Sequence, residues 1–302
     1  MAVRSSRRSF LTLLAATPVL ASAACSSSRS SSPSSSSSGV LNVAVEPYAP
    51  YTTVQNGTIV GLDGDILNYV AGKLGLQVKP QVTDFAGMLA GVQSGRVDIT
   101  IGGIAWTADR QKQGLFTDPP YYSPPAMAVR SGKTYRTISD LKGLNLGTVT
   151  GYVWVKSIQA VPGATLHAYP TAEAVFEDLA AGRIDVGFLD PLLIIAAQKA
   201  DPGMRIATEY LTPPSLAEVA RTPAYQYFRP YQTGFYLPRK DTALEQSISA
   251  QIDAMYKSGE LSTLVKKYGG DPQQFLVPTA DMTADRRGVD RPATWTAPSI
   301  SA

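Results

Sequence analysis

LAGVQSGRVDITI at residues 89–101 and LAAGRIDVGFL at residues 179–189 decide the fold of this 302-residue chain. Each stretch runs from the apolar end of a helix through Gly-Arg-apolar-Asp into an apolar strand. Gly95 and Gly182 suit the helix ends because glycine adopts the left-handed backbone at little cost. Because the two stretches share their length and register, we expect two lobes with the same order of helices and strands, rather than a chance similarity between two helix–strand connections.

The residues before the first stretch extend this plan. Residues 41–45 predict a strand, residues 65–74 an amphipathic helix ending at Gly75, and residues 76–82 a second strand. The order strand–helix–strand predicts a parallel sheet flanked by helices. Because open α/β sheets bind ligands at the carboxyl ends of their strands, we expect the site after residues 101 and 189.

Two proline-rich segments are the expected crossings between the lobes. The first lies at residues 119–125, and the second ends in the strand-like residues 233–237. The resulting boundaries are 39–128 for the first part of lobe one, 129–232 for lobe two, 233–278 for the return of lobe one, and 279–302 for an irregular tail.

The N-terminal region is typical of an export signal. Residues 1–24 combine arginines, an apolar run and small residues, and the pair Arg7-Arg8 resembles a twin-arginine signal. Cys25 follows as in a lipoprotein, and residues 25–38 form a serine-rich tether. We therefore expect export and lipid anchoring through Cys25 at the outer face of the cytoplasmic membrane. Cleavage without lipid and export by the general secretory route are the alternatives.

Composition excludes several classes of function. The formal net charge is +3, and three arginines of residues 1–24 account for it, which argues against a nucleic-acid partner. One cysteine and one histidine allow neither an internal disulfide nor a Cys/His zinc site. We expect no metal, no cofactor and no hydrolytic triad.

Seven short motifs follow one another along the chain: Tyr48-Ala49-Pro50-Tyr51, Gly61-Leu62-Asp63-Gly64-Asp65, Ser94-Gly95-Arg96-Val97-Asp98, Thr107-Ala108-Asp109-Arg110, Phe116-Thr117-Asp118-Pro119, Asp140-Leu141-Lys142-Gly143 and Gly182-Arg183-Ile184-Asp185. In their order and spacing they resemble those of the extracellular solute-binding proteins of family 3, which serve polar amino acid ABC importers. The resemblance covers residues 39–278 and implies a type II periplasmic-binding-protein-like α/β fold, with a mixed, mostly parallel sheet in each lobe and two hinge strands. It also implies a monomer without enzymatic activity that binds an amino-acid-like solute and docks on a permease.

The resemblance assigns the two charged ends of the ligand. Arg110 would clamp the carboxylate with paired donors, and Asp190 would receive the ammonium together with the carbonyl of Gly103. Arg110 could instead be a surface residue paired with Asp109. Asp190 could also cap a helix that begins at Pro191.

Further residues would surround the rest of the ligand. Tyr48 and Phe85 would sandwich its side chain, unless they belong to the core, and Glu46 would contact a polar group on that side chain. Backbone N–H groups of Ala105, Gly151 and Val153 would donate to the carboxylate. Ala105 replaces the usual hydroxyl residue, and Tyr152 and Val153 replace small ones, so the ligand's identity stays open.

Two other functions remain open from the sequence. A few relatives of this fold are periplasmic dehydratases, and a carboxylate acid–base pair would serve such an enzyme. A solute sensor for a signalling partner would use the same binding site.

Overall fold

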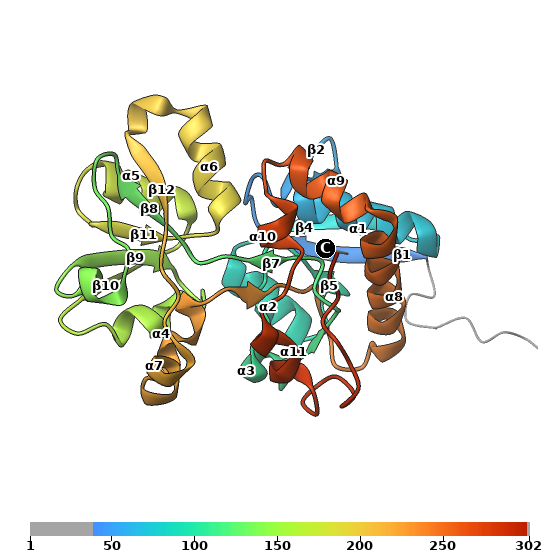
Figure 1. Ribbon diagram of the computed structural model, residues 1–302. Coiled ribbons are helices and arrows are strands. Elements are labelled where there is room, and N and C mark those ends of the chain that lie inside the picture. The colour runs from blue at the N-terminus through green and yellow to red at the C-terminus, as the bar shows by residue number, and fades with distance from the viewer. Residues whose placement is uncertain (1–38, 301–302) are drawn as a thin grey trace, which may run out of the picture. The chain divides into compact units, whose positions relative to one another are not determined.

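The computed structural model describes residues 39–300 (Figure 1). The predicted signal peptide, the serine-rich tether and Cys25 lie outside these residues. Within the described range, no helix has both the length and the apolar character needed to cross a bilayer.

The first sheet contains five strands in the order β4-β1-β5-β14-β6. β1 pairs in parallel with β4 and β5, whereas β14 runs antiparallel to β5 and β6. The strands are β1 (Val40–Val45), β4 (Gln77–Val82), β5 (Ile99–Thr100), β6 (Leu115–Phe116) and β14 (Tyr236–Leu237).

The second sheet repeats this arrangement with the order β10-β9-β11-β8-β12. β9 pairs in parallel with β10 and β11, and β8 runs antiparallel to β11 and β12. The strands are β8 (Ala126–Arg130), β9 (Asn145–Val149), β10 (Thr165–Tyr169), β11 (Val186–Phe188) and β12 (Ile206–Tyr210). The predicted α/β fold of two lobes, each with a mixed sheet, is therefore confirmed.

The repeated Gly-Arg-apolar-Asp motif has the same structural role in both sheets. Gly95 and Gly182 have φ angles of 69° and 76°, in the left-handed region that favours glycine. The Asp98 carboxylate accepts a 2.8 Å hydrogen bond from the backbone N–H of Asn42 at the start of the sheet. Asp185 accepts the corresponding 3.0 Å bond from Asn145. Each aspartate thus links the strand that follows it to the neighbouring parallel strand, β1 for Asp98 and β9 for Asp185.

The two crossings pair with each other as short strands. β7 (Tyr122–Ser123) and β13 (Tyr231–Gln232) form an antiparallel ladder between the sheets. β8 begins at Ala126, so the predicted boundary at residue 128 falls inside a strand of lobe two. The sequence could not separate them because only Pro124 and Pro125 lie between β7 and β8. A hairpin of β2 (Thr53–Gln55) and β3 (Thr58–Val60) completes the strands of lobe one.

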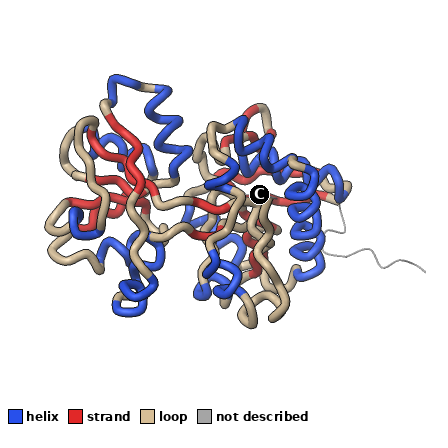
Figure 2. The backbone as a smooth tube through the Cα atoms, in the orientation of Figure 1, coloured by secondary structure: helices blue, strands red, loops and turns tan. Residues whose placement is uncertain are grey.

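Helices flank both sheets (Figure 2). Those of the lobe-one segments are α1 (Leu62–Leu74), α2 (Phe85–Gln93), α3 (Ala108–Gln111), α8 (Thr242–Ser258), α9 (Glu260–Lys267) and α10 (Pro272–Phe275). Those of lobe two are α4 (Trp154–Gln159), α5 (Ala172–Ala180), α6 (Pro191–Ala200) and α7 (Leu216–Arg221), with short 3-10 turns η1 (Ile138–Leu141), η2 (Pro202–Met204) and η3 (Pro223–Phe228).

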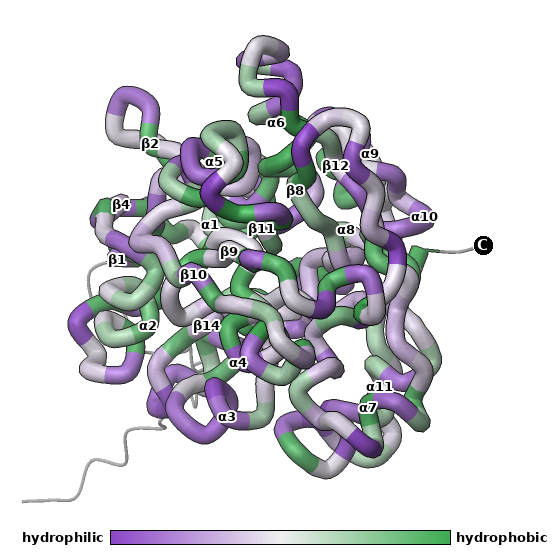
Figure 3. The backbone as a smooth tube through the Cα atoms, turned by 90° about the vertical axis from the view of Figure 1, so that its left-hand side faces the viewer, coloured by the Kyte–Doolittle hydropathy of each residue, from purple (hydrophilic) through white to green (hydrophobic). Residues whose placement is uncertain are grey.

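The central strands of each sheet are apolar and buried. β11 and most of β8 are fully covered, and Figure 3 shows both as hydrophobic. Buried apolar area of this kind is the main driving force for folding. The burial of these strands holds in place the strand ends from which the loops of the site begin.

The C-terminal tail corrects the prediction of an irregular segment. Residues Ala280–Arg286 form α11, and Arg286 is completely buried. Arg286 and the nearby Arg291 bind acidic side chains and the carbonyl of Phe116, which belongs to lobe one. Residues 287–300 contain no helix or strand, so the correction concerns α11 alone. This helix could not be predicted because the tail has little apolar periodicity and is held by charge and aromatic contacts instead.

Candidate functional site

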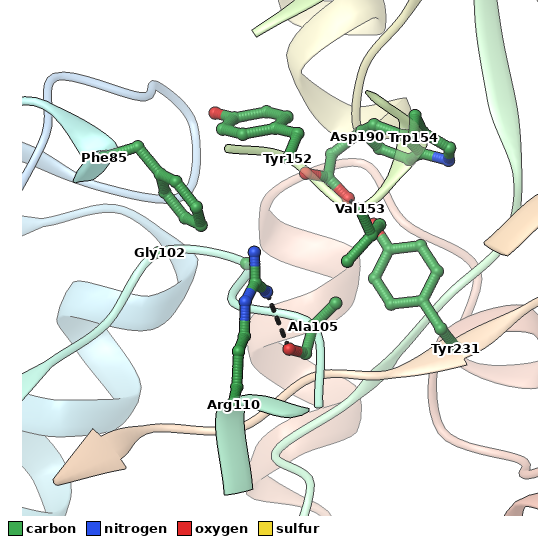
Figure 4. Close-up of a pocket in the computed structure, with 10 residues that line it drawn as sticks. Phe85, Gly102, Ala105, Arg110, Tyr152, Val153, Trp154, Asp190 and Tyr231 are labelled. Carbon is green, nitrogen blue, oxygen red and sulfur yellow. Dashed lines mark hydrogen bonds between the residues drawn. The ribbon is translucent and has the colours of Figure 1, made fainter. Parts of the chain in front are cut away.

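A small cavity lies where loops from the two lobes meet (Figure 4). Its volume is about 20 Å³, enough for about one water molecule. It is lined by Phe85, Gly102, Gly103, Ala105, Arg110, Tyr152, Val153, Trp154, Asp190 and Tyr231. Six of the nine ligand-binding residues predicted from the sequence are among them.

Arg110 enters the cavity from α3 of lobe one. Thr107 caps this short helix by accepting a hydrogen bond from the backbone N–H of Arg110. The guanidinium donates to the carbonyls of Ala105 at 2.8 Å and Gly151 at 3.0 Å, and lies 5.1 Å from the centre of the Phe85 ring. No acidic side chain among residues 39–300 forms an ion pair with it.

The alternative role of Arg110 as a partner of Asp109 is not what the structure shows. Asp109 pairs with Lys112 at 3.0 Å and with Lys156 at 3.6 Å, both on the exposed surface. Burial lowers the pKa of Arg110, which nevertheless stays a cation because the ordinary value for arginine is so high. Arg110 therefore presents an unneutralised positive charge at the cavity.

Asp190 enters the same cavity from lobe two. It occupies the N-cap position of α6, but its side chain makes no capping hydrogen bond to that helix. Its carboxylate instead accepts hydrogen bonds from the hydroxyls of Tyr48 at 2.8 Å and Ser123 at 2.9 Å, and from Tyr231. Burial raises the pKa of Asp190, and these hydrogen bonds oppose the rise. No cation in the described part of the chain pairs with it.

Gly103 lies directly against Asp190. Its φ angle is 67°, and a Cβ atom placed there would lie 3.3 Å from the Asp190 carboxylate. The Gly102–Gly103 turn is held by Asp63, whose carboxylate accepts from Gly102 and from the Tyr121 hydroxyl at 2.7 Å. Burial raises the pKa of Asp63 to about 7. The turn thus places Gly103 beside the acid of lobe two in the lining of the cavity.

Glu46 and Tyr48 are buried but do not line the cavity. Tyr48 stacks on Tyr51 with ring centres 5.4 Å apart, while its hydroxyl reaches Asp190. Glu46 accepts a 2.9 Å hydrogen bond from the hydroxyl of Tyr152, and burial raises the pKa of Glu46 to about 7. Phe85 does line the cavity, in edge contact with Tyr152 at 4.8 Å.

The turn at Gly151 contacts Arg110 through its carbonyl. Gly151 has a φ angle of 85°, and the next two residues, Tyr152 and Val153, line the cavity. Ala105 also contacts Arg110 through its carbonyl, and it bridges to Thr233 in the return crossing. The predicted hydrogen bonds from the backbone N–H groups of Ala105, Gly151 and Val153 to a ligand carboxylate stay a prediction.

Sequence reasoning missed Tyr231 and Trp154, which line the cavity, and Ser123, which donates to Asp190. Tyr231 and Ser123 lie on the two crossing strands, which were identified only as boundaries, although residues between two lobes are well placed to face a site. Trp154 follows the Gly151 turn, and its indole N–H donates to the carbonyl of Tyr227. The places of Tyr231 and Ser123 could not be assigned without knowing how the two crossing strands pair.

The site therefore joins opposite charges from the two lobes without neutralising them. Lobe one contributes the guanidinium of Arg110, and lobe two contributes the carboxylate of Asp190. The rest of the lining consists of four aromatic residues and four small or aliphatic ones, namely Phe85, Tyr152, Trp154 and Tyr231 with Gly102, Gly103, Ala105 and Val153. Such a site is complementary to a small molecule that carries an anionic and a cationic group.

Comparison with known proteins agrees with this geometry. Residues 41–271 match the bacterial extracellular solute-binding proteins, family 3. The chain is 31% identical over 169 residues to the ABC transporter arginine-binding protein 1 of Escherichia coli (strain K12), covering 55% of this chain and 69% of that protein. It is 27% identical over 239 residues to the L-cystine-binding protein TcyJ of the same organism, covering 77% of this chain and 83% of that protein.

A solved structure shows the same fold. An ancestral arginine-binding protein bound to arginine superposes with a TM-score of 0.66 and 26% identity, covering 77% of this chain and 99% of the other. The family match spans most of the described residues and includes both lobes and the cavity between them. The chain therefore belongs to the bacterial extracellular solute-binding proteins of family 3.

Proposed function

We propose that this protein binds a small amino acid between its lobes and delivers it to an ABC importer. The observation that carries the proposal is the pair Arg110 and Asp190, which line one cavity from different lobes without a countercharge of their own. The carboxylate of the amino acid would accept paired hydrogen bonds from Arg110. Its ammonium would donate to Asp190 and to the carbonyl of Gly103.

Binding energy in this scheme favours the arrangement in which the lobes meet. A ligand that bridges Arg110 and Asp190 binds that arrangement better than any in which the lobes are apart, so it shifts the population toward it. The permease would then recognise the ligand-bound arrangement. Micromolar affinity, about −8 kcal/mol, is a reasonable expectation for one clamped zwitterion.

The proposal includes an exported, monomeric protein without catalytic residues. In this proposal, Cys25 carries the lipid anchor, residues 26–38 form the rest of the serine-rich tether, and Arg7-Arg8 directs export by the twin-arginine route. The serine-rich composition of the tether and the small residues before Cys25 support this part. Amino acid transport is supported by the arginine-binding and cystine-binding relatives, whose names describe their own ligands.

Calorimetric titration with a panel of amino acids tests the proposal. We expect Arg110→Ala and Asp190→Asn each to weaken binding by at least about 30-fold, because each leaves one charge of the ligand buried and unpaired. Asn keeps an oxygen that the Tyr48 and Ser123 hydroxyls can reach, so the fold should persist. Arg96→Ala, which removes an exposed arginine of lobe one, is the matched control and should bind as the wild type does.

Unchanged affinity in either pocket variant would contradict the proposed site. A wild-type protein that binds no amino acid of the panel would contradict the proposed function.

A further inference from the structure

Tyr152 occupies the space in which a ligand side chain is expected. Its ring centre lies 4.8 Å from that of Phe85 and 6.1 Å from that of Tyr48, in edge contact with both. Its hydroxyl donates to the Glu46 carboxylate at 2.9 Å. Glu46, Tyr48 and Phe85 are the three residues that the sequence assigned to the ligand's side chain, and we name the space among them the side-chain subsite.

The Tyr152 side chain reaches this subsite from the other lobe. It belongs to the turn between β9 and α4 in lobe two, whereas Glu46, Tyr48 and Phe85 belong to lobe one. Only 8% of Tyr152 and 7% of Glu46 are exposed, so the contact is buried. Figure 4 shows the Tyr152 ring above the cavity, beside Phe85 and Asp190.

The contact satisfies Glu46 without a cation. No lysine or arginine among residues 39–300 pairs with Glu46. A phenol hydroxyl is a neutral donor, and a long cationic side chain would have to displace it to reach the carboxyl of Glu46. The remaining cavity, of about 20 Å³, is lined by Arg110 and Asp190 together with Phe85 and Tyr152, whereas Glu46 does not line it.

We infer that Tyr152 is a specificity-determining residue that fills the side-chain subsite and restricts the ligand to amino acids with very small side chains, such as glycine or alanine. The inference rests on the proposed function, because it concerns the same site. A long side chain must displace the Tyr152 ring, losing its aromatic contacts and its hydrogen bond to Glu46. Glycine or alanine brings no side chain that reaches Glu46, so the Tyr152 contacts can persist while the cavity of about 20 Å³ widens around the charged groups of the ligand.

The consequence for Glu46 follows from its surroundings. When the Tyr152 ring is removed, a buried carboxyl group faces an empty, aromatic-walled space. A cationic side chain that enters there gains a charge-assisted hydrogen bond to Glu46 and a stacking surface on Phe85. Shortening Tyr152 should therefore convert the preference from small amino acids to cationic ones.

Calorimetric titration of the full chain with alanine and with arginine tests the inference. The wild type should bind alanine at least about 100-fold more tightly than arginine. Tyr152→Ala should raise the affinity for arginine about 100-fold, and adding Glu46→Gln should remove most of that gain. Tyr169→Ala is the matched control, because Tyr169 also donates to a carboxylate, that of Asp178, within lobe two and outside the cavity.

Two results would overturn the inference and leave the proposed function intact. One is a wild type that binds arginine as tightly as alanine. The other is a folded Tyr152→Ala variant with an unchanged ratio of the two affinities. If Tyr152→Ala fails to fold, as judged by its melting curve, Tyr152→Thr replaces it, and the wild-type ratio decides independently. If no variant binds any amino acid, the proposed function fails and the inference fails with it.

Discussion

The cavity and the C-terminal tail are two regions rich in buried charge, and they differ in how that charge is balanced. In the tail, Arg286 is fully buried and donates to Asp290 at 2.5 Å and 3.1 Å. Its guanidinium also lies 5.7 Å and 5.4 Å from the ring centres of Trp106 and Trp295. In the cavity, Arg110 has an aromatic neighbour and two carbonyls but no acid.

The rest of the tail follows the same rule. Arg291 binds Asp118 at 2.6 Å and Glu245 at 2.8 Å, and both carboxylates belong to lobe one. Each buried charge of the tail therefore has an opposite charge in contact, as a purely structural ion cluster requires. The cavity keeps Arg110 and Asp190 apart, so their charges remain available to a ligand that carries both signs.

Replacing Arg286 and Arg110 by methionine, each in a separate variant, should produce the largest difference in stability between the two regions. Arg286→Met leaves the Asp290 carboxylate, whose side chain is 2% exposed, without its main partner. We expect the free energy of unfolding to fall by about 3–5 kcal/mol. Arg110→Met leaves no buried acid unpaired and should cost about 1 kcal/mol or less. Urea denaturation of the two variants measures both values.

The affinity for the ligand should change in the opposite order to the stability. Arg110→Met should abolish binding, and Arg286→Met should leave the affinity unchanged at a temperature where it is folded. Comparable losses of stability in the two variants would mean that the charge balance described above does not separate the regions. Arg286→Met combined with Asp290→Asn should recover part of the loss, because it removes the unpaired charge.

A smaller effect on stability is expected from the buried carboxyl of Glu46, which has no cationic partner among residues 39–300. Burial raises the pKa of Glu46 from 4.5 to about 7, with Asp190, Glu173 and Asp84 adding to the rise and the Tyr152 hydrogen bond opposing it. Between these values the folded protein keeps a proton that the unfolded chain has lost. Stability therefore decreases as the pH rises through this window and stays at its lower value above it.

Glu46→Gln removes this titration and keeps an acceptor for the Tyr152 hydroxyl. The wild type should lose more stability than the variant between about pH 4 and about pH 8, by no more than about 3 kcal/mol. Denaturant melts at the two pH values give the difference, in which the titrations of Asp63 and Asp190 largely cancel. An identical pH dependence in both proteins would show that Glu46 is not held in its protonated form.

The two-lobed fold could be predicted because its signals are local and repeated. Gly95 and Gly182 end helices, and Asp98 and Asp185 fix the following strands, all within short stretches of sequence. The exact crossing could not be placed, since only two prolines lie between β7 and β8 and only the pairing of β7 with β13 separates hinge from lobe.

The charged ends of the site were also predictable, whereas their surroundings were not. Arg110 and Asp190 follow a helix cap and a buried strand, and the structure brings them to one cavity. The direction of the Tyr152 side chain depends on Glu46, a residue 106 positions away. The tail helix likewise depends on Trp106 and Phe116, which sequence periodicity within residues 279–302 does not reveal.

The most direct measurement compares one amino acid with its two halves. The wild-type protein is titrated calorimetrically with the amino acid that binds most tightly, with its deaminated acid and with its decarboxylated amine. If Arg110 and Asp190 each hold one charge of the ligand, both analogues should bind at least about 30-fold more weakly. An analogue that keeps the affinity of the parent amino acid would contradict the two-ended clamp.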